Sequence, residues 1–427
     1  MLDIKFIKEN EKLVKDNLKK KFQENLIPQV DKTVKLYDQW LKLKKDVEDL
    51  RHRRNIISQE INELVKTGKK ADKQKNEAKQ IPDKIKSLEE KQTQTYNEMQ
   101  ELLLKVPNII HKSVPIGKSI ADNKVKKTIG KIPKFNFQIK NHVELAESLG
   151  VIDFEASAKT SGNGFYYLKN ELALLNQALI QFAINHMVKK KYTYIETPLM
   201  LNEKSIFASM DKETIENSVY DIQGEDLHLI GTSEQSLLAM HSNQTIKEED
   251  LPKKYFSYSM CFRKEIGSHG INEKGLWRTH QFNKVEQFVF CRPEDSYKYY
   301  DELLKNTEEI FQKLKLPYRV LEMCSADLAP WKSKSADVEV YRPTTKQYEE
   351  VASLSNCTDY QARKLNTKVL RKNGTKEVLH TLNNTVIATS RAMVAILENY
   401  QQKNDSIKIP AVLLPYMCGI KVIKKLK

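Results

Sequence analysis

The chain has 427 residues, which is long enough for about two domains with a sizeable core. Its formal net charge of +15 and sequence pI near 9.2 favour an acidic binding partner, nucleic acid first. Five scattered cysteines without a CxxC pair argue against a thiolate zinc site and favour a reducing compartment. The sequence contains neither an apolar run long enough to span a membrane nor a hydrophobic signal core, so we expect a soluble, cytoplasmic protein with no membrane partner.

Two heptad seams follow a short basic lead-in over residues 1–32. Apolar residues recur at alternating spacings of four and three from Leu36 to Leu64, and again from Ile85 to Val106, which is typical of packed helices. The segment between the seams is rich in charge, and its Pro82 suits the first turn of the second helix. We expect an antiparallel two-helix coiled-coil arm that projects from the body, with each helix roughly 40–50 Å long.

Basic side chains cover the outer faces of this predicted arm: Lys42, Lys44, Lys45, Arg51, Arg53, Lys66, Lys69, Lys70, Lys73, Lys84 and Lys86. A basic two-helix rod can follow a phosphate backbone by charge and shape, without reading bases. Oligomerisation, scaffolding and plain solvation of lysine are the alternatives. The charge pattern alone leaves all of them open.

A second domain is expected after a proline-punctuated linker. Residues 170–191 have the spacing of an amphipathic helix, and residues 192–201 read as a strand that Pro198 stops. Further β-type runs and a helical stretch over 293–315 indicate an α+β fold with a mostly antiparallel sheet flanked by helices. We therefore divide the chain into an arm domain, a linker and a larger domain, at residues 1–110, 111–135 and 136–427. No P-loop or GxGxxG motif supports a Walker or Rossmann site.

One β-hairpin carries a conspicuous set of charged and aromatic residues. Its strands are expected from Tyr255 to Arg263 and from Gln281 to Phe290, joined by a polar, Gly-containing loop. Phe282 and Glu286 lie four residues apart, so both side chains face the same side of the sheet. Guanidinium forks bind phosphate, aromatic faces stack on bases and carboxylates bind ammonium groups, so the hairpin suits a nucleotide. The alternative is an exposed hairpin with solvated charges.

Three further clusters hold residues that could bind a polar ligand. Thr232 and Glu234 lie two apart after a strand-like run, although Thr-Ser-Glu is also a helix-cap signature and the spacing alone favours that interpretation. Glu350 and Ser353 are expected at the end of a strand, where they could share Mg²⁺ or be merely solvated, and solvation is favoured. Arg391 is expected in the first turn of an apolar helix, an odd place for a cation without an anion nearby.

Together, the segments FRKE, GLWRTHQFNKVEQF, EEVASLSNCTDYQARK and TLNNTVIATSRAMVAILENYQ resemble the seryl-tRNA synthetases, a family of class II aminoacyl-tRNA synthetases. The resemblance covers almost the whole chain, including LRHRRN in the arm and VPNIIHKSVPIGKS in the linker. Class II motif one corresponds to residues 170–201, motif two to the hairpin and motif three to residues 381–400. FRxE alone indicates only class II, whereas SNCTDYQAR and the TSE triplet narrow the resemblance to serine.

By matching positions, the resemblance implies an ATP site formed by Arg263, Lys264, Glu265, Thr279, His280, Gln281, Phe282, Glu350, Val351, Ala352, Ser353 and Arg391. It implies a serine site formed by Thr232, Ser233, Glu234, Arg263, Glu286, Asn383 and Thr385. Arg263 and Glu265 would contact the α-phosphate and the adenine side, and Phe282 would stack on adenine. Arg391 would bind the γ-phosphate. Glu350 and Ser353 would hold Mg²⁺, and Arg263, Glu350 and Arg391 would be the catalytic set.

The resemblance implies ATP-dependent ligation of L-serine to tRNA(Ser) through seryl-adenylate, and charging of tRNA(Sec) where that tRNA is present. It also implies a homodimer through motif one, with the arm grasping tRNA. Three positions depart from the family pattern: Thr385 and its neighbours replace a bacterial GSG, Trp331 stands where small residues are usual, and Gly164 where arginine is expected. The competing hypotheses are a non-catalytic, synthetase-like RNA-binding protein and a class II ligase for another small amino acid or a carrier-protein acceptor.

Overall fold

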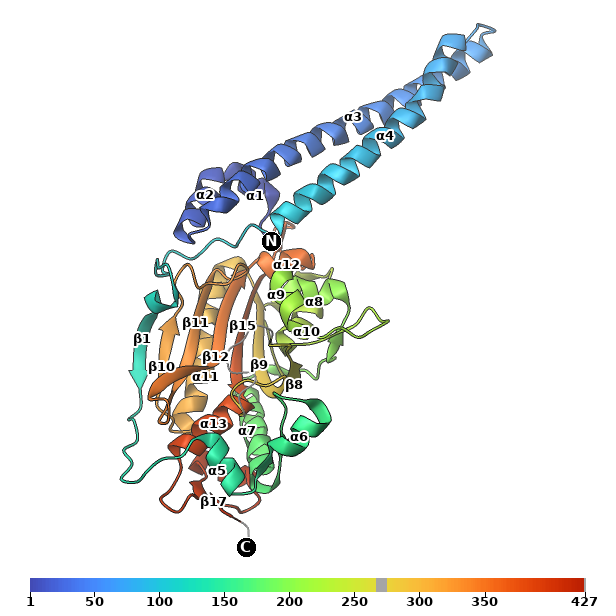
Figure 1. Ribbon diagram of the computed structural model, residues 1–427. Helices are drawn as coiled ribbons and strands as arrows, with labels where there is room; N and C mark the ends of the chain where they lie inside the picture. The colour runs from blue at the N-terminus through green and yellow to red at the C-terminus, as the bar shows by residue number, and fades with distance from the viewer. Residues whose placement is uncertain (266–274, 426–427) are drawn as a thin grey trace. The chain divides into compact units, whose positions relative to one another are not determined.

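The computed structural model describes residues 1–265 and 275–425, and the chain divides into two compact units, Met1–Pro107 and Asn108–Lys427. Figure 1 colours the chain from its N-terminus to its C-terminus. The loop expected to join the strands of the hairpin falls largely on residues 266–274, which lie outside the described residues. Among the described residues, no helix is both long and apolar enough to cross a membrane.

The first unit is helical and contains the predicted arm. Its elements are α1 (Ile4–Glu9), α2 (Glu11–Lys20), the 3₁₀ helix η1 (Glu24–Leu26), α3 (Ile27–Lys66) and α4 (Asp72–Leu103). Helices α3 and α4 run antiparallel along each other (Figure 1), and Val47, Ile57, Ile81 and Ile85 form the buried seam between them. The predicted coiled-coil hairpin is therefore confirmed. At 1.5 Å per residue, the 40 residues of α3 span about 60 Å, more than expected, because the helix begins well before Leu36.

Two details of the arm differ from the sequence-based expectation. Pro82 does not begin the second helix but lies inside α4, which begins at Asp72. The buried isoleucines on either side of Pro82 contribute the packing that offsets a proline's usual cost of about 3 kcal/mol in a helix interior. In addition, Arg51 and Arg53 pair with Glu89 and Glu77 of α4, so these two arginines join the helices, whereas the lysines expected on the outer faces are exposed.

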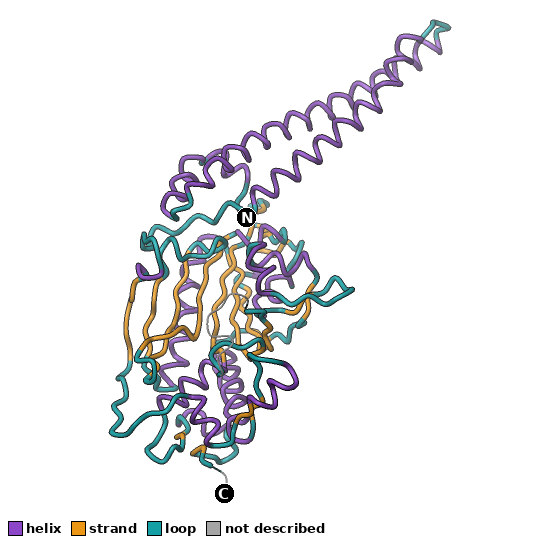
Figure 2. Tube along the Cα trace, viewed as in Figure 1, coloured by secondary structure: helices purple, strands orange, loops and turns teal. Residues whose placement is uncertain are grey.

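The second unit is built on one large sheet, which appears as the band of orange strands in Figure 2. Along the sheet the described strands are ordered β1 (Lys124–Ile129), β10 (Tyr318–Glu322), β11 (Lys334–Arg342), β12 (Gln347–Thr358), β15 (His380–Ala388), β9 (Gln281–Cys291), β8 (Lys253–Phe262) and β4 (Thr193–Tyr194). All neighbours are antiparallel except β4 and β8. The expected α+β fold with a mostly antiparallel sheet is confirmed.

Helices and short strands surround this sheet. The helices are η2 (Ile120–Asp122), α5 (His142–Ser148), α6 (Phe154–Ser161), α7 (Asn170–Lys189), α8 (Glu203–Ser209), α9 (Lys212–Ser218), α10 (Ser233–Ala239), η3 (Glu248–Asp250), η4 (Pro293–Asp295), α11 (Ser296–Lys313), α12 (Tyr360–Lys364), α13 (Thr389–Asn399) and η5 (Ala411–Tyr416). The remaining strands are β2 (Ile152–Asp153), β3 (Tyr167–Leu168), β5 (Met200–Leu201), β6 (His228–Leu229), β7 (Thr245–Lys247), β13 (Lys368–Leu370), β14 (Lys376–Val378), β16 (Ile407–Lys408) and β17 (Val422–Ile423). Apolar residues of α7, α11 and α13 form the main core with one face of the sheet, which leaves the other face for polar groups.

Two sequence-based boundaries in this unit were wrong. Residues 192–201 do not form one strand, because only β4 and β5 are extended and irregular backbone around Pro198 separates them. Glu350 and Ser353 lie within β12, which continues to Thr358, and not at a strand end. The stretch 111–135 contains β1, the edge strand of the large sheet, and its assignment as a linker stays a prediction.

Candidate active site

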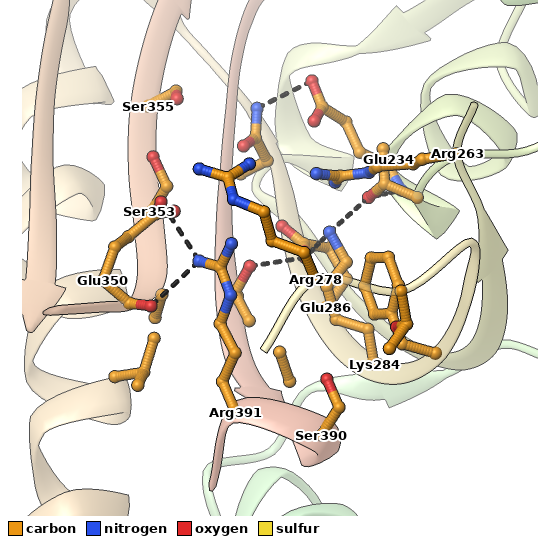
Figure 3. A pocket seen from close by; sticks show the side chains of 18 of the residues that line it. Glu234, Arg263, Arg278, Lys284, Glu286, Glu350, Ser353, Ser355, Ser390 and Arg391 are labelled. Carbon is orange, nitrogen blue, oxygen red and sulfur yellow. Dashed lines mark hydrogen bonds and ion pairs between the residues drawn. The ribbon is translucent and has the colours of Figure 1, made fainter. Parts of the chain in front are cut away.

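A cavity of about 240 Å³ opens on the polar face of the sheet, over its central strands (Figure 3). It is lined by Met210, Thr232, Glu234, Arg263, Glu265, Trp277, Arg278, Thr279, Phe282, Lys284, Glu286, Trp331, Lys332, Glu350, Val351, Ala352, Ser353, Ser355, Asn383, Thr385, Ala388, Ser390 and Arg391. Cationic and anionic side chains are almost balanced in this lining. The cavity therefore suits a ligand that carries charges of both signs.

Strand β9 supplies one wall because its side chains alternate between the two faces of the sheet. Phe282, Lys284 and Glu286 line the cavity, whereas Gln287 points to the other face and donates to the backbone oxygen of Leu303 in α11 at 2.9 Å. The prediction that Phe282 and Glu286 share a face is confirmed. The same alternation brings polar residues of β12 and β15 into the cavity beside them.

One end of the cavity holds a buried ion pair. The Lys284 ammonium lies 2.7 Å from Glu286 Oε2 and donates to Thr232 Oγ1 at 2.6 Å. Thr385 Oγ1 donates to the same carboxylate at 3.1 Å. All four residues are at least nine-tenths buried, so these contacts are shielded from water and hold the side chains in fixed positions.

A second buried carboxylate, Glu234, lies at this end. Thr232 caps α10 and accepts from the backbone N–H of Glu234, so the helix-start interpretation of the TSE triplet is confirmed while both residues still line the cavity. Asn383 Nδ2 donates to Glu234 Oε1 at 2.9 Å. Burial, and next the negative charge of Glu286, raise the pKa of Glu234 to about 6.

The other end of the cavity is more open and carries a looser ion pair. Arg391, in the first turn of α13 as expected, lies 3.1 Å from Glu350 Oε2 and donates to the Glu350 backbone oxygen at 2.9 Å. The guanidinium also lies 5.4 Å from the centre of the Trp277 ring. Partial desolvation raises the pKa of Glu350, but the charge of Arg391 outweighs it, so this pKa lies below its ordinary value.

Two arginines of the hairpin, Arg263 and Arg278, lie between these two ends. Arg263 donates through Nε to the backbone oxygen of Gly231 at 3.2 Å, and its guanidinium lies 5.2 Å from the centre of the Phe282 ring. Arg278 pairs with Glu265 at 3.5 Å. Two guanidinium groups thus reach the cavity between the carboxylates of its buried end and the open end (Figure 3), where an anionic group of a ligand would meet both.

The residues expected to hold Mg²⁺ fit a hard cation. Glu350 and Ser353 both line the cavity, and Asp337 is paired with Ser353 across β11 and β12. Burial, reinforced by the charge of Glu350, raises the pKa of Asp337 well above its usual range, and its Oδ1 has no hydrogen-bond partner among the described residues. No set of three or more metal-ligating side chains occurs in the described part of the chain, so Mg²⁺ here would take its remaining ligands from substrate phosphates and water, as it commonly does.

The structure brings most of the sequence-predicted site residues into this one cavity, but four do not line it. Lys264 pairs with Asp221, and His280 Nδ1 lies 2.9 Å from both the Tyr220 hydroxyl and the Arg263 backbone oxygen. Gln281 reaches Met260 at the partly buried start of β9, and Ser233 is buried in the first turn of α10. For these four residues, as for those that line the cavity, the assignment to an ATP or serine site stays a prediction.

Several lining residues were missed by the sequence reasoning. Lys284 had a usable signal, since it lies between Phe282 and Glu286 in the same alternation. Trp331, which the sequence marks only as a departure from the family pattern, is buried and lines the cavity with Lys332. Met210 comes from the segment after α8, which no motif marks.

Comparisons with known proteins match both parts of the chain. Residues 1–110 match the model of the seryl-tRNA synthetase N-terminal domain, and residues 215–400 match the class II tRNA synthetase core domain for G, H, P, S and T. A serine–tRNA ligase of Methanocella arvoryzae is 44% identical over 99% of this chain and 100% of its own length. The crystal structure of seryl-tRNA synthetase from Pyrococcus horikoshii complexed with ATP has a TM-score of 0.94 and 39% identity, covering 100% of both chains. Cytoplasmic serine–tRNA ligase from Naegleria fowleri, in complex with AMP, has a TM-score of 0.89 and 31% identity over 100% of this chain and 99% of its own.

Proposed function

This chain belongs to the seryl-tRNA synthetase family of class II aminoacyl-tRNA synthetases, and from that premise we propose that it ligates L-serine to tRNA(Ser) in two steps, through seryl-adenylate. The observation that carries the proposal is the shared cavity: the carboxylates Glu234 and Glu286 face the same space as the guanidiniums of Arg263 and Arg391. An amino acid and a triphosphate have the complementary charges.

The buried end of the cavity is where serine binds. It contains two carboxylates, Glu234 and Glu286, but one ammonium, Lys284, which is paired with Glu286. The α-ammonium of serine supplies the missing positive charge beside Glu234, since a buried carboxylate is costly without a partner. Oε2 of Glu234 accepts no hydrogen bond from a described residue, which leaves it for that ammonium.

Selection for the hydroxyl of serine rests on polar groups at the same end. One wall of the cavity is buried and consists of hydrogen-bonding side chains, those of Thr385, Glu286 and Asn383. Alanine would leave these groups unpaired, and comparable sites reject such an analogue by about 10⁴–10⁵-fold. Threonine adds one methyl group, and its rejection depends on how closely this wall fits.

The first step joins the two ligands at the centre of the cavity. A carboxylate oxygen of serine attacks the α-phosphorus of ATP in line, forming one P–O bond while the bond to the β-phosphate bridging oxygen breaks and pyrophosphate leaves. Arg263 and Arg278 neutralise the charge of the α-phosphate. Arg391 breaks its ion pair with Glu350 and binds the γ-phosphate instead. The arginines work by positioning and by electrostatic stabilisation, without a covalent enzyme intermediate.

Glu350 and Ser353 hold Mg²⁺ in this proposal, supported by their position and by the buried Asp337 carboxylate behind them. A bound Mg²⁺ would neutralise phosphate charge. Phe282 stacks on adenine, which its aromatic face and its place beside Arg263 allow.

In the second step a hydroxyl of the terminal adenosine of tRNA attacks the seryl carbonyl carbon, and AMP leaves. We propose that the exposed lysines of α3 and α4 bind the tRNA backbone, that the protein acts as a homodimer through motif one, and that it also charges tRNA(Sec) where that tRNA is present. Charging assays with each purified tRNA, and sedimentation of the protein, test these three statements.

The decisive experiment measures exchange of labelled pyrophosphate into ATP. We expect exchange that depends on serine and is far weaker with threonine, alanine or glycine. A purified, folded protein with no exchange would be the non-catalytic RNA-binding protein of the competing hypothesis. Exchange with another amino acid in place of serine would indicate a class II ligase of different specificity.

A further inference from the structure

Helix α12 lies in the SNCTDYQARK segment, yet none of its residues lines the cavity. Its second residue, Gln361, is completely buried. The Gln361 Nε2 amide donates to Glu234 Oε1 at 2.7 Å and to the backbone oxygen of Ser209 at 2.9 Å. Its Oε1 accepts from Thr381 Oγ1 at 2.8 Å. Both amide hydrogens are therefore committed, one of them to a residue of the cavity wall.

The hydrogen bonds to Glu234 are unevenly divided between its two oxygens. Gln361 and Asn383 both donate to Oε1, at 2.7 and 2.9 Å. Oε2 receives no hydrogen bond from any residue that the structure describes, although it is not sealed off from the cavity. Two fixed donors on one oxygen hold the carboxylate in a single orientation, with the other oxygen available to a ligand.

The same face of α12 also holds the end of α8. Lys364, one turn after Gln361, donates to the backbone oxygens of Phe207 at 3.0 Å and Met210 at 2.6 Å. The last backbone carbonyls of a helix have no partner within the helix. Here Gln361 and Lys364 donate to three carbonyls at the end of α8, those of Phe207, Ser209 and the following residue, Met210. Met210 lines the cavity, so α12 sets the position of two parts of the cavity wall without touching its contents.

We propose that Gln361 is a positioning residue for amino-acid selection: it fixes Glu234 so that Oε2 meets the α-ammonium of the substrate. This inference rests on the proposed serine activation and adds to it a residue that contacts neither serine nor ATP. It also gives the YQARK segment a physical role, because its Gln361 orients the Glu234 carboxylate from the side away from the cavity.

Charge around Glu234 provides a way to test this role. The groups that face Glu234 are Lys284 and Glu286 on β9, Lys332 on the segment before β11 and the Cys357 thiol on β12. Burial and Glu286 raise the pKa of Glu234 to about 6, and the hydrogen bond from Gln361 works against that rise. Removing the amide therefore moves this pKa further upward, towards the pH at which the enzyme would be assayed.

The experiment compares Gln361→Met with Gln287→Met. Both remove a completely buried amide from the same unit, but Gln287 faces α11 and not the cavity. For Gln361→Met we expect the KM for serine in pyrophosphate exchange to rise about 10-fold or more at pH 7, as for a lost hydrogen bond to a charged group. The midpoint of its pH dependence should move up by about one unit, with the KM for ATP unchanged. Gln287→Met should lower thermal stability and leave the midpoint in place.

The same midpoint in both variants would overturn the inference, because a purely structural amide would not move it. If Gln361→Met does not fold, Thr381→Val removes only the hydroxyl that holds Gln361 Oε1, and a smaller upward shift is expected; no shift would again overturn the inference. A wild-type protein without serine-dependent exchange would instead refute the proposed function, before any variant is compared.

Discussion

The two ends of the cavity are built differently. At the buried end, which we propose binds serine, the side chains of Lys284 and Glu286 are 7% and 1% exposed, and each is held by more than one polar partner. At the open end, which we propose binds the triphosphate, the side chains of Glu350 and Arg391 are 45% and 22% exposed, and their ion pair is longer, at 3.1 Å. Discrimination among small amino acids needs fixed, dry groups, whereas a triphosphate brings enough charge to replace exposed ion pairs. Rigidity is concentrated where the ligand is small.

The largest expected effect comes from breaking the buried pair. Glu286→Gln leaves the Lys284 ammonium buried without its partner, which should lower the free energy of unfolding by about 3–5 kcal/mol. Serine-dependent exchange should fall by about 10³-fold, on the scale of that energy. Urea unfolding and exchange assays measure the two losses.

The control for this variant is Lys284→Met combined with Glu286→Gln. Removing both charges should recover much of the stability, because a buried pair contributes little net free energy compared with an unpaired charge, while exchange stays lost. Normal serine activation by Glu286→Gln alone would show that the buried end does not bind the amino acid.

Removing a guanidinium from the centre should separate activity from stability. Arg263→Ala should lower the rate of exchange by about 10²–10³-fold, the usual cost of one preorganised stabilising donor. Because the Arg263 side chain is only partly buried and binds a backbone oxygen, the unfolding midpoint should stay near that of the wild type. Full activity in this variant would refute its role at the α-phosphate.

Glu234 should lower the stability of the protein at high pH, because its carboxylate is buried. Its folded-state pKa of about 6 lies above the ordinary 4.5, so the folded protein binds this proton more tightly than the unfolded chain. The stabilising contribution is complete below pH 4.5 and is lost as the pH rises through 6. Glu234→Gln, which has no charge to bury, should therefore gain up to about 2 kcal/mol over the wild type at pH 8 while losing serine activation. Equal stabilities at pH 8, measured by urea unfolding, would contradict the buried charge.

The smallest effect on serine activation is expected from substitutions in the arm, which should alter neither end of the cavity. Changing Lys42, Lys45, Lys69 and Lys73 to Gln should leave exchange unchanged and weaken tRNA charging. The slope of log KM for tRNA against log salt should fall by about 0.7–0.9 for each phosphate that the substituted lysines no longer neutralise. Unaltered charging at all salt concentrations would mean that these lysines are merely solvated. Arg51 and Arg53 are unsuitable for this test because they join α3 to α4.

Sequence patterns predicted the parts of the molecule that repeat at short range. Heptads gave the arm, and the two-residue period of β9 correctly placed Phe282 and Glu286 on one face. The patterns could not give the full length of β12, whose polar end is buried by segments distant in sequence. They also could not predict that Trp331 and Lys332 line the cavity or that Gln361 holds Glu234. These residues come from segments that no sequence pattern marks and that only the folded structure brings to the site. Resemblance to a family singled out carboxylates and arginines that line one cavity, but not the residues that hold them in place.

The alternation along β9 has a consequence for how this protein can vary. Inserting or deleting a single residue between Gln281 and Lys284 would turn Lys284 and Glu286 towards α11 and bring Gln287 into the cavity, if the start of the strand kept its register. Diverging copies of the gene should therefore tolerate length changes before and after this strand but not within it, and an engineer who wishes to alter amino-acid preference must do so by substitution at fixed length.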